Sequence, residues 1–467
     1  MDPLLLIDFG SPYTKLPALD LDEERILGRS QAFTTAASDI KEGLDQALER
    51  LEASLGRLDY RARLASSSAA GGLAMMVSGL VPELTAEAAR MAALGAGAKI
   101  VRLFSYGLSR EDLDFISQSP PDIFLLTGGT DGGNREVITA NAAGLARLPV
   151  RFPVIYAGNR NALDDCRELL ADFPLTVCPN VMPRFGQLNI LDVQREIRTL
   201  FLSRIVKARG LSQARELLSG ILMPTPSALL SAMELLALGT RDEAGIGDLL
   251  AIDVGGATTD VYSMAKGEPQ NINVIYKGFE EPYAKRTVEG DIGVRYSLEG
   301  IVQDQGLESL AGEAGMSPGE LTLLLEELEA DRSRLPLGDQ DQLLRLDQAL
   351  AAGALDMASR RHAGRLEEVY TPTGLTYLQT GKDLRGLGTL ILTGGCLAHG
   401  NQPLAMARRA LYSRAHPLSL RPEAVQVLVD RSYILAAMGV LADRYPEAAL
   451  RIMKKELVKA GQVSWQA

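Results

Sequence analysis

Two short sequences in this chain place an aspartate and glycines directly after an apolar run. They are Asp8-Phe9-Gly10-Ser11, after residues 4–7, and Asp253-Val254-Gly255-Gly256, after residues 249–252. Glycine lets the backbone turn tightly and brings its N–H groups close to an anion. An aspartate beside such a turn supplies the kind of oxygen ligand that holds Mg²⁺ next to phosphate oxygens. The pair, about 245 residues apart, therefore predicts two halves that contact one nucleotide.

Around these motifs, short apolar runs alternate with amphipathic stretches. The alternation predicts strands at 99–104, 122–127, 153–157 and 175–178, and helices at 109–118, 134–147 and 159–171. A further strand is expected to end at 63–66. A long helical stretch is expected at 189–218. Alternation of this kind is typical of a mostly parallel sheet that is covered by helices on both faces.

The length of 467 residues is too great for one hydrophobic core, so we expect more than one domain. The polar stretch 239–247 marks a boundary, and the helical, charge-rich residues 300–368 are expected to form an insertion. We therefore predict a first lobe at 1–238, a second lobe at 239–431, and a helix and tail at 432–467 that pack back on the first lobe. Small residues at Ala436, Ala437 and Gly439 suit close packing of the helix 432–441.

The composition excludes several classes of protein. The net charge of −11 argues against a general nucleic-acid binder. The three cysteines form no C-x-x-C pair, which gives no zinc, iron–sulfur or disulfide signature. No run reaches the length of a membrane span, and the start of the chain lacks the basic region of a signal peptide. We expect a cytoplasmic protein that does not contact a membrane, and the oligomeric state is left open.

The ordered motifs resemble those of the actin, heat-shock-chaperone and sugar-kinase superfamily. Residues 8–15 resemble its first phosphate motif, 253–260 its second phosphate motif, and 390–400 its adenosine motif, while 226–230 and 432–441 resemble its two connecting helices. These motifs follow the superfamily's order across nearly the whole chain. The resemblance implies an α/β fold of two actin-like (ribonuclease H-like) lobes, with a nucleotide cleft between them and a helical insertion in the second lobe.

The same resemblance implies a site for ATP and Mg²⁺. Asp8 and Asp253 would be the catalytic carboxylates on the metal side. Gly394 and Gly395 would lie against the adenosine, where a side chain would clash. The residues expected to contact the nucleotide are Gly10, Ser11, Thr14, Lys15, Gly255, Gly256, Thr258, Thr259, Gly290, Asp291, Gly394 and Gly395.

Two further segments are similar to the MutL family of glutamate mutase accessory proteins, which is unrelated to the mismatch-repair protein of that name. They are 127–134 (TGGTDGGN) and 288–297 (VEGDIGVRYS). This resemblance implies an ATP-dependent, chaperone-like reactivating factor that releases damaged cobalamin from an adenosylcobalamin-dependent mutase of the glutamate mutase or amino mutase type. The chain has no Asp-x-His-x-x-Gly motif for binding cobalamin itself. We expect the partner surface on the helical insertion at 300–368.

One position departs from the superfamily pattern. Chaperone relatives begin the first connecting helix with a glutamate, whereas this chain has Thr225. The change favours a slow ATPase, or a different water-positioning residue such as Asp131, whose loop either faces the cleft or forms a turn at a sheet edge. A small-molecule kinase, a hydantoinase-like hydrolase and a non-enzymatic scaffold resembling bacterial actins stay open as alternatives.

Overall fold

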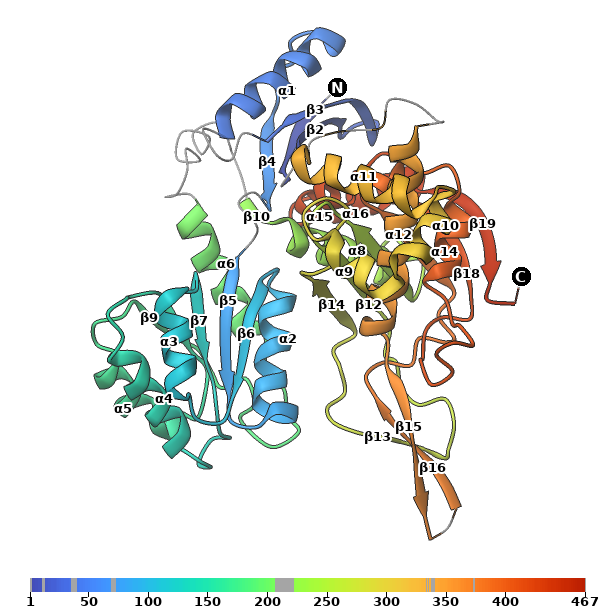
Figure 1. Cartoon of the computed structure of the whole chain (residues 1–467). Coiled ribbons are helices and arrows are strands. Elements are labelled where there is room, and N and C mark those ends of the chain that lie inside the picture. The colour runs from blue at the N-terminus through green and yellow to red at the C-terminus, as the bar shows by residue number, and fades with distance from the viewer. Residues whose placement is uncertain are drawn as a thin grey trace. The chain divides into compact units, whose positions relative to one another are not determined.

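A computed structural model of the chain describes residues 2–10, 13–34, 40–68, 73–205, 222–332, 334, 336, 341–372 and 374–466. It divides the chain into two compact units (Figure 1). The C-terminal unit contains Met1–Leu6, Pro17–Gly28 and Ala228–Ala467, and the N-terminal unit contains Ile7–Leu16 and Arg29–Ser227. The three segments expected from the sequence stay a prediction.

The C-terminal unit is built on a six-stranded sheet with the order β14-β12-β11-β17-β18-β19. Its strands are β11 (Leu249–Val254), β12 (Thr259–Met264), β14 (Ala284–Glu289), β17 (Thr389–Thr393), β18 (Ala424–Val429) and β19 (Val458–Ser464). The first three strands in sequence pair antiparallel, whereas β11, β17 and β18 run parallel. Numbered from its first strand, the sheet has the order 3-2-1-4-5, with β19 added at one edge.

The same strand order occurs near the N-terminus. There the sheet order is β10-β4-β1-β2-β3, which is again 3-2-1-4-5 when it is read from β3. The strands are β1 (Pro3–Phe9), β2 (Tyr13–Asp20), β3 (Arg25–Phe33), β4 (Ala62–Ser67) and β10 (Leu222–Pro224), and α1 (Ile40–Leu55) follows β3. This repetition confirms the predicted α/β class with two architecturally related halves.

A separate parallel sheet is inserted between β4 and β10. Its order is β6-β5-β7-β8-β9, or 2-1-3-4-5. The strands are β5 (Ala74–Gly79), β6 (Lys99–Ser105), β7 (Ile123–Leu126), β8 (Val154–Tyr156) and β9 (Leu175–Val177). The four strands that the sequence predicted beyond residue 98 are confirmed. The strand expected to end at 63–66 is β4, which belongs to the other sheet and pairs with β10. An apolar run shows that a strand exists, but not which strand it pairs with.

Helices cover both faces of this inserted sheet (Figure 1). A short π-helical turn (Pro82–Ala86) leads into α2 (Glu87–Gly95), which lies against β5 and β6, and α6 (Leu191–Ile205) contacts β8. The other face packs on α3 (Arg110–Gln118), α4 (Glu136–Ala146) and α5 (Leu163–Leu169), the last entered through a short 3₁₀ turn (Arg160–Ala162). Phe124 and Leu126 belong to that second core, because alternate strand residues point to opposite faces.

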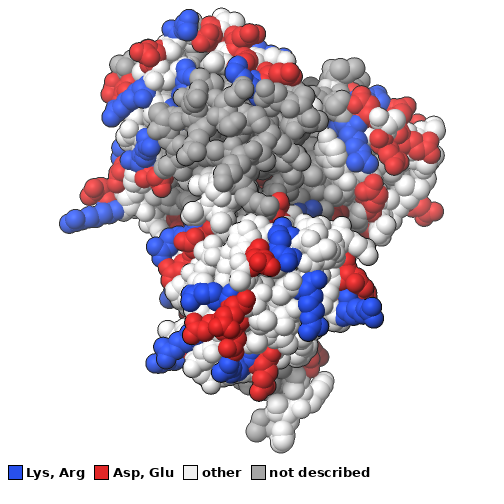
Figure 2. Space-filling model, turned by 90° about the vertical axis from the view of Figure 1, so that its left-hand side faces the viewer, with Lys and Arg blue, Asp and Glu red and all other residues white. Residues whose placement is uncertain are grey.

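The outer surface of α4 and α5 carries charges of both signs. Figure 2 shows basic and acidic side chains interspersed on this face of the molecule, and those of α4, α5 and the adjoining loops are arginines, aspartates and glutamates. Several of them pair with one another: Arg135 with Asp165, Arg151 with Asp172, and Arg167 with Asp164. These pairs are exposed, so each contributes little to stability.

The predicted helical insertion in the second lobe is confirmed. It consists of α9 (Leu298–Gln305), α10 (Leu307–Ala314), α11 (Pro318–Ala330) and α12 (Gln342–His362). Ser317 and Glu320 form a capping box at the start of α11, and the Asp341 side chain accepts a hydrogen bond from the Leu343 N–H at the start of α12. Most of α12 is buried, so the insertion forms one core with the six-stranded sheet.

A small sheet that the sequence analysis did not predict follows the insertion. It has the order β13-β16-β15, made of β13 (Val274–Tyr276), β15 (Arg365–Thr371) and β16 (Gly374–Thr380). Figure 1 shows β15 and β16 as a long hairpin that extends away from α12. Beyond it come α13 (Gly395–Ala398), α14 (Pro403–Arg409), α15 (Leu435–Ala442) and α16 (Pro446–Glu456). Within the described residues, no helix has the length and apolar character needed to cross a membrane.

The helix α8 (Thr225–Leu238) crosses α15 at very short range. A Cβ atom placed on Gly439 would lie 1.8 Å from the Ala228 carbonyl oxygen, which is backbone and cannot rotate away. The contact requires glycine at this position. It agrees with the prediction that the small residues of this helix serve close packing.

Replacing Gly439 by valine is expected to destabilise the C-terminal unit by about 3 kcal/mol, because the two helices must separate to admit the side chain. A Cβ atom placed on Gly312, in α10, would meet no heavy atom within 4 Å. Gly312→Ala is therefore a matched control that should raise stability by about 0.5–1 kcal/mol. Urea denaturation of both variants measures the effect. A Gly439→Val variant as stable as the parent would contradict the close crossing.

Candidate functional site

The first phosphate motif forms a tight hairpin between β1 and β2. The Gly10 N–H donates to the Tyr13 carbonyl oxygen at 3.0 Å, and the Gly10 carbonyl accepts from the Thr34 hydroxyl at 2.8 Å. A Cβ on Gly10 would lie 2.7 Å from the same Tyr13 oxygen, so the turn requires glycine. Ser11 lies outside the described residues. The fixed hairpin leaves Asp8 at the end of the strand, beside the turn.

The Asp8 carboxylate is buried and oriented by two hydroxyl groups. Its Oδ1 accepts from Ser66 at 3.0 Å and from Thr225 at 2.7 Å. Ser66 is the second-last residue of β4 and Thr225 begins α8, so the fold brings together residues that are far apart in sequence. Thr225 occupies the position where chaperone relatives have glutamate. The Thr225 hydroxyl donates to Asp8 and so orients the Asp8 carboxylate. A threonine has no carboxylate, so Thr225 cannot accept a proton from water as a glutamate would.

Two other predicted residues follow the hairpin on β2. Thr14 is fully buried, and its hydroxyl lies 3.1 Å from the Thr34 hydroxyl. Thr34 in turn donates to Gly10, so these threonines brace the loop from behind. Lys15 is the next residue of the strand, and its side chain is half-buried. Contacts of Thr14 and Lys15 with phosphate stay a prediction.

The second phosphate motif repeats the first in its geometry. The Gly255 N–H donates to the Thr258 carbonyl oxygen at 2.9 Å, and a Cβ on Gly255 would lie 2.8 Å from that oxygen. Asp253 stands two residues before this glycine, just as Asp8 stands two residues before Gly10. Each hairpin joins the first and second strands of a sheet with the order 3-2-1-4-5. The two halves of the chain thus present the same combination of carboxylate and turn.

The hydroxyl groups of the second motif already have partners in the protein. Thr258 donates to Asp260 Oδ2 at 3.3 Å, and Thr259, which is fully buried, donates to the Ile292 carbonyl oxygen at 3.1 Å. Asp260 forms a buried ion pair with Arg286 at 2.6 Å, which gives this aspartate a structural role. The Gly255 N–H is also occupied, because it donates to Thr258, so the backbone of Gly256 is the better candidate for contact with phosphate.

Residues 290–297 pack directly on this second turn. The N–H groups of Arg295 and Tyr296 both donate to the Gly256 carbonyl oxygen at 2.8 Å, and Val294 donates to Gly255. A Cβ on Gly293 would lie 2.6 Å from the Gly256 oxygen. The segment that resembles the accessory proteins therefore supports the turn from one side.

Arg295 also ties this segment to the helical insertion. Its guanidinium forms a bidentate pair with Asp347 on α12, with N–O distances of 2.5 and 2.6 Å. Both side chains are nearly buried. Burial raises the pKa of the Asp347 carboxyl, and Arg295 offsets part of that rise. The sequence analysis missed this pair, because 52 residues separate its members and no local pattern joins them.

Asp291 forms an ion pair with Arg361, which lies on α12. Its carboxylate lies 2.8 Å from Arg361 Nη1, which also pairs with Glu289. These contacts raise the pKa of the Arg361 guanidinium. The predicted contact of Gly290 and Asp291 with the nucleotide is not tested by this arrangement and stays a prediction.

The third glycine turn packs against the second phosphate motif. Gly394 has φ +101°, and a Cβ there would lie 2.3 Å from the Val254 carbonyl oxygen and 2.9 Å from Asp253 Oδ1. The requirement for glycine at 394 therefore comes from contact with β11. Gly395 begins α13 and has open space on its side-chain position. Whether either glycine contacts adenosine stays a prediction.

A buried aspartate that the sequence analysis missed links this turn to α15. Asp430 Oδ2 accepts from the Thr393 hydroxyl at 3.1 Å, and its Oδ1 accepts from the Ile434 N–H at 3.0 Å. It follows β18 and precedes α15, so it caps the helix and holds the turn at once. An aspartate between an apolar strand and an apolar helix was a signal that could have been noticed.

The loop 127–134 lies at the carboxyl end of the inserted sheet. Asp131 Oδ1 accepts from Asn180 Nδ2 and from the Arg160 N–H, each at 3.0 Å. The Asn159 amide donates to the Gly133 and Asn134 carbonyl oxygens. These contacts favour the interpretation of Asp131 as the builder of a sheet-edge turn.

Each hairpin, taken by itself, supplies a carboxylate of the kind that Mg²⁺ uses as a ligand. Magnesium is usually held by one or two carboxylates together with substrate phosphates. Asp8 and Asp253 each supply one carboxylate beside a glycine turn. Among the described residues, no group of three or more histidine, cysteine, aspartate or glutamate side chains gathers as a metal cluster. At either carboxylate, a magnesium ion would need phosphate oxygens or water to complete its ligands.

Two sheets of the order 3-2-1-4-5, each starting with an Asp-x-Gly hairpin, define the actin-like class of α/β proteins. The chain belongs to the MutL protein family, whose model matches residues 4–457. Protein MutL of Clostridium tetanomorphum is 44% identical over 463 residues, which cover 98% of this chain and 100% of that protein.

The solved structures that match this chain have much lower identity. An activator of 2-hydroxyisocaproyl-CoA dehydratase from Clostridium difficile, with bound ADPNP, is 10% identical with a TM-score of 0.34, covering 98% of this chain and 99% of that one. A Plasmodium falciparum glycerol kinase with ADP is 12% identical with a TM-score of 0.36, covering 96% and 92%. Scores of this size do not define the fold, so its assignment rests on the strand orders.

Proposed function

We propose that this chain is an ATP-binding accessory factor that reactivates an adenosylcobalamin-dependent mutase and hydrolyses ATP slowly. The observation that carries the proposal is the repeated hairpin, in which Asp8 with Gly10 and Asp253 with Gly255 have the same geometry. Membership of the MutL protein family supports the link to a mutase of the glutamate mutase type.

The residues of the two hairpins would hold Mg-ATP. Asp8 and Asp253 would hold Mg²⁺, directly or through water, and the backbone N–H groups of the turns would bind phosphate oxygens. When bound, the metal neutralises charge on the phosphates. Thr225 orients Asp8 and supplies no carboxylate for a water molecule. Without this carboxylate, ATP is hydrolysed slowly. Slow hydrolysis suits a factor whose ATP-bound conformation acts on the partner.

Two chains of contact would carry a change at the nucleotide into the protein. One runs from Gly256 through Arg295 to Asp347 on α12. The other runs from the turn at Gly394 through Thr393 and Asp430 to the start of α15. A ligand shifts a conformational equilibrium only by the difference in its affinity for the two states. If ATP and ADP contact Gly256 differently, the difference would be transmitted through Arg295 and would shift the conformational equilibrium of the helical insertion.

The test uses a glutamate-mutase-type enzyme inactivated with cyanocobalamin. Addition of this protein, Mg-ATP and fresh adenosylcobalamin should restore mutase activity, whereas omission of ATP should not. Recovery without ATP would exclude an ATP-driven factor. Phosphorylation of a small metabolite in the same mixture, without recovery of the mutase, would favour the kinase alternative instead.

A further inference from the structure

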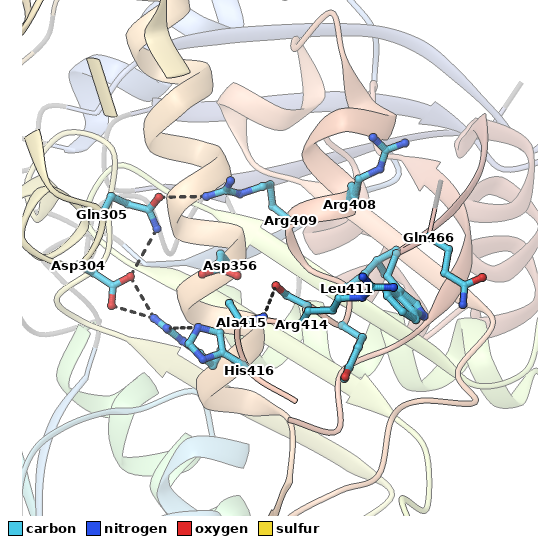
Figure 3. Close-up of a pocket in the computed structure, with 14 residues that line it drawn as sticks. Asp304, Gln305, Asp356, Arg408, Arg409, Leu411, Arg414, Ala415, His416 and Gln466 are labelled. Carbon is cyan, nitrogen blue, oxygen red and sulfur yellow. Dashed lines mark hydrogen bonds and ion pairs between the residues drawn. The ribbon is translucent and has the colours of Figure 1, made fainter. Parts of the chain in front are cut away.

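A pocket in the C-terminal unit lies outside the nucleotide motifs. It has a volume of about 1020 Å³, and its walls come from the ends of α9, α12 and α14, the loop 411–416 and the C-terminal residues 465–466. Figure 3 shows arginines from different elements around it, with Arg409 directed toward Gln305. Arg360, which also lines the pocket, contacts Asp304 and His416. Four arginines and two aspartates line it, although the whole chain has a net charge of −11.

Each aspartate of this pocket is already neutralised by an arginine. Both Asp304 oxygens accept from Arg360, at 2.8 and 3.0 Å. Asp356 accepts at 2.7 Å from Arg421, a fully buried residue behind the wall. Arg421 Nε and Nη2 have no hydrogen-bond partner among the described residues. The carboxylates therefore leave no net negative charge in the pocket.

His416 contacts the arginine that pairs with Asp304. Its Nε2 lies 2.8 Å from Arg360 Nη1. A guanidinium only donates, so the imidazole nitrogen is the acceptor in this contact. Arg409 has Gln305 at 3.0 Å and Glu313 at 3.7 Å.

Two arginines are left without compensation. Arg408 and Arg414 are exposed, and neither has an acidic partner within 4.0 Å in the part of the chain that the structure describes. The Arg414 guanidinium lies over the Trp465 ring, 5.4 Å from its centroid, and Tyr412 contacts the same ring edge-to-face at 5.0 Å. The pocket thus combines the uncompensated positive charge of Arg408 and Arg414 with the aromatic rings of Tyr412 and Trp465.

We propose that this pocket, which we call the arginine pocket, docks an acidic segment of the mutase partner. The proposal rests on the proposed function. Tryptophan, tyrosine and arginine are the residues that most often dominate the energy of protein interfaces. The pocket is larger than most small-ligand sites and opens at the exposed Arg408 and Arg414. Carboxylates of the partner would meet these two arginines, and an apolar side chain would cover Trp465.

The position of the arginine pocket also suits the work of a reactivating factor. Asp356 and Arg360 lie on α12, the helix that Asp347 joins to the second phosphate turn. A partner docked there would contact α12, the helix that is connected to Gly256 through Arg295 and Asp347. This assignment sharpens the prediction of a partner surface at 300–368, since α14 and the C-terminal residues complete the pocket.

The only tryptophan of the chain gives a direct measurement. Protein labelled with 5-fluorotryptophan should show one ¹⁹F resonance, from Trp465, and unlabelled mutase should shift or broaden it. The Arg408→Glu/Arg414→Glu variant should lose mutase affinity by at least about tenfold at low ionic strength, with a smaller loss at high salt. Its ATP hydrolysis in the absence of mutase should equal that of the parent.

A matched control has the same change of charge elsewhere in the C-terminal unit. Arg241 and Arg365 are exposed, and Arg241→Glu/Arg365→Glu should bind mutase like the parent. Unchanged ¹⁹F resonance while ATP restores mutase activity would overturn the docking site but keep the proposed function. No change together with no reactivation would overturn both. An equal ¹⁹F response to citrate alone, retained in competition with mutase, would show a site for small anions and overturn docking.

Discussion

Replacing Asp253 by alanine is expected to reduce Mg²⁺-dependent ATP hydrolysis at least about 100-fold, because the developing charge at the phosphates loses its metal-side carboxylate. Asp8→Ala should have an effect of the same order, since its carboxylate occupies the equivalent position in the first hairpin. Both residues lie at the ends of strands, so circular dichroism should change little. Steady-state phosphate release, measured with and without Mg²⁺, gives the result.

Two controls make this result specific. Asp242→Ala removes an exposed carboxylate of the same unit outside the turns and should leave hydrolysis unchanged. Asp253→Asn keeps the size of the side chain and removes only its charge, so it should behave like Asp253→Ala. Calorimetry should show that the parent binds Mg-ATP. Hydrolysis at the parental rate by both Asp8→Ala and Asp253→Ala would refute the assignment of the metal side.

The second large effect is expected from Asp347→Ala. This change leaves the Arg295 guanidinium buried without its carboxylate, which typically costs about 3–5 kcal/mol in the free energy of unfolding. The segment that supports Gly256 should loosen as well, so the affinity for Mg-ATP should fall. Urea denaturation and calorimetry measure the two effects.

A double variant and an exposed pair test the cause. Arg295→Met/Asp347→Leu removes both charges together and should recover much of the lost stability, because neither charge is left alone. Glu367→Ala breaks an exposed pair with Lys277, at 3.7 Å, and should cost less than about 1 kcal/mol. Equal stability losses for Asp347→Ala and Glu367→Ala would show that burial of the pair is unimportant.

Local patterns in the sequence predicted the hairpins and the helices of the insertion correctly. Each depends on neighbours in the chain: an apolar strand, then a residue that turns, or a capping residue before an amphipathic run. The α/β class followed from the alternation of these elements, whereas the two actin-like lobes followed from the resemblance of the ordered motifs. The contacts of Asp8 illustrate what a local pattern lacks, because Ser66 and Thr225 reach it from 58 and 217 residues away.

The missed features have two physical origins. Strand β5, next to the edge strand β6, was missed because the run at 74–77 is short and has no alternation. The pairing of β4 with β10 and the pair of Arg295 with Asp347 depend on tertiary structure alone. The β13-β16-β15 sheet was missed because its strands come from segments about 90 residues apart, and the preceding helical pattern gave no sign of a hairpin.

The inserted parallel sheet lies in sequence between β4 and β10, and this insertion point has an evolutionary consequence. β4 and β10 are parallel neighbours, with Ala65 opposite Leu222 and Ser67 opposite Pro224. Parallel neighbours always require a crossover of a dozen or more residues. The whole domain therefore occupies a connection that had to exist in any case. It could be gained, exchanged or shortened to a single helix in a descendant lineage without a change in the register of the host sheet, and so without rebuilding the hairpin that carries Asp8.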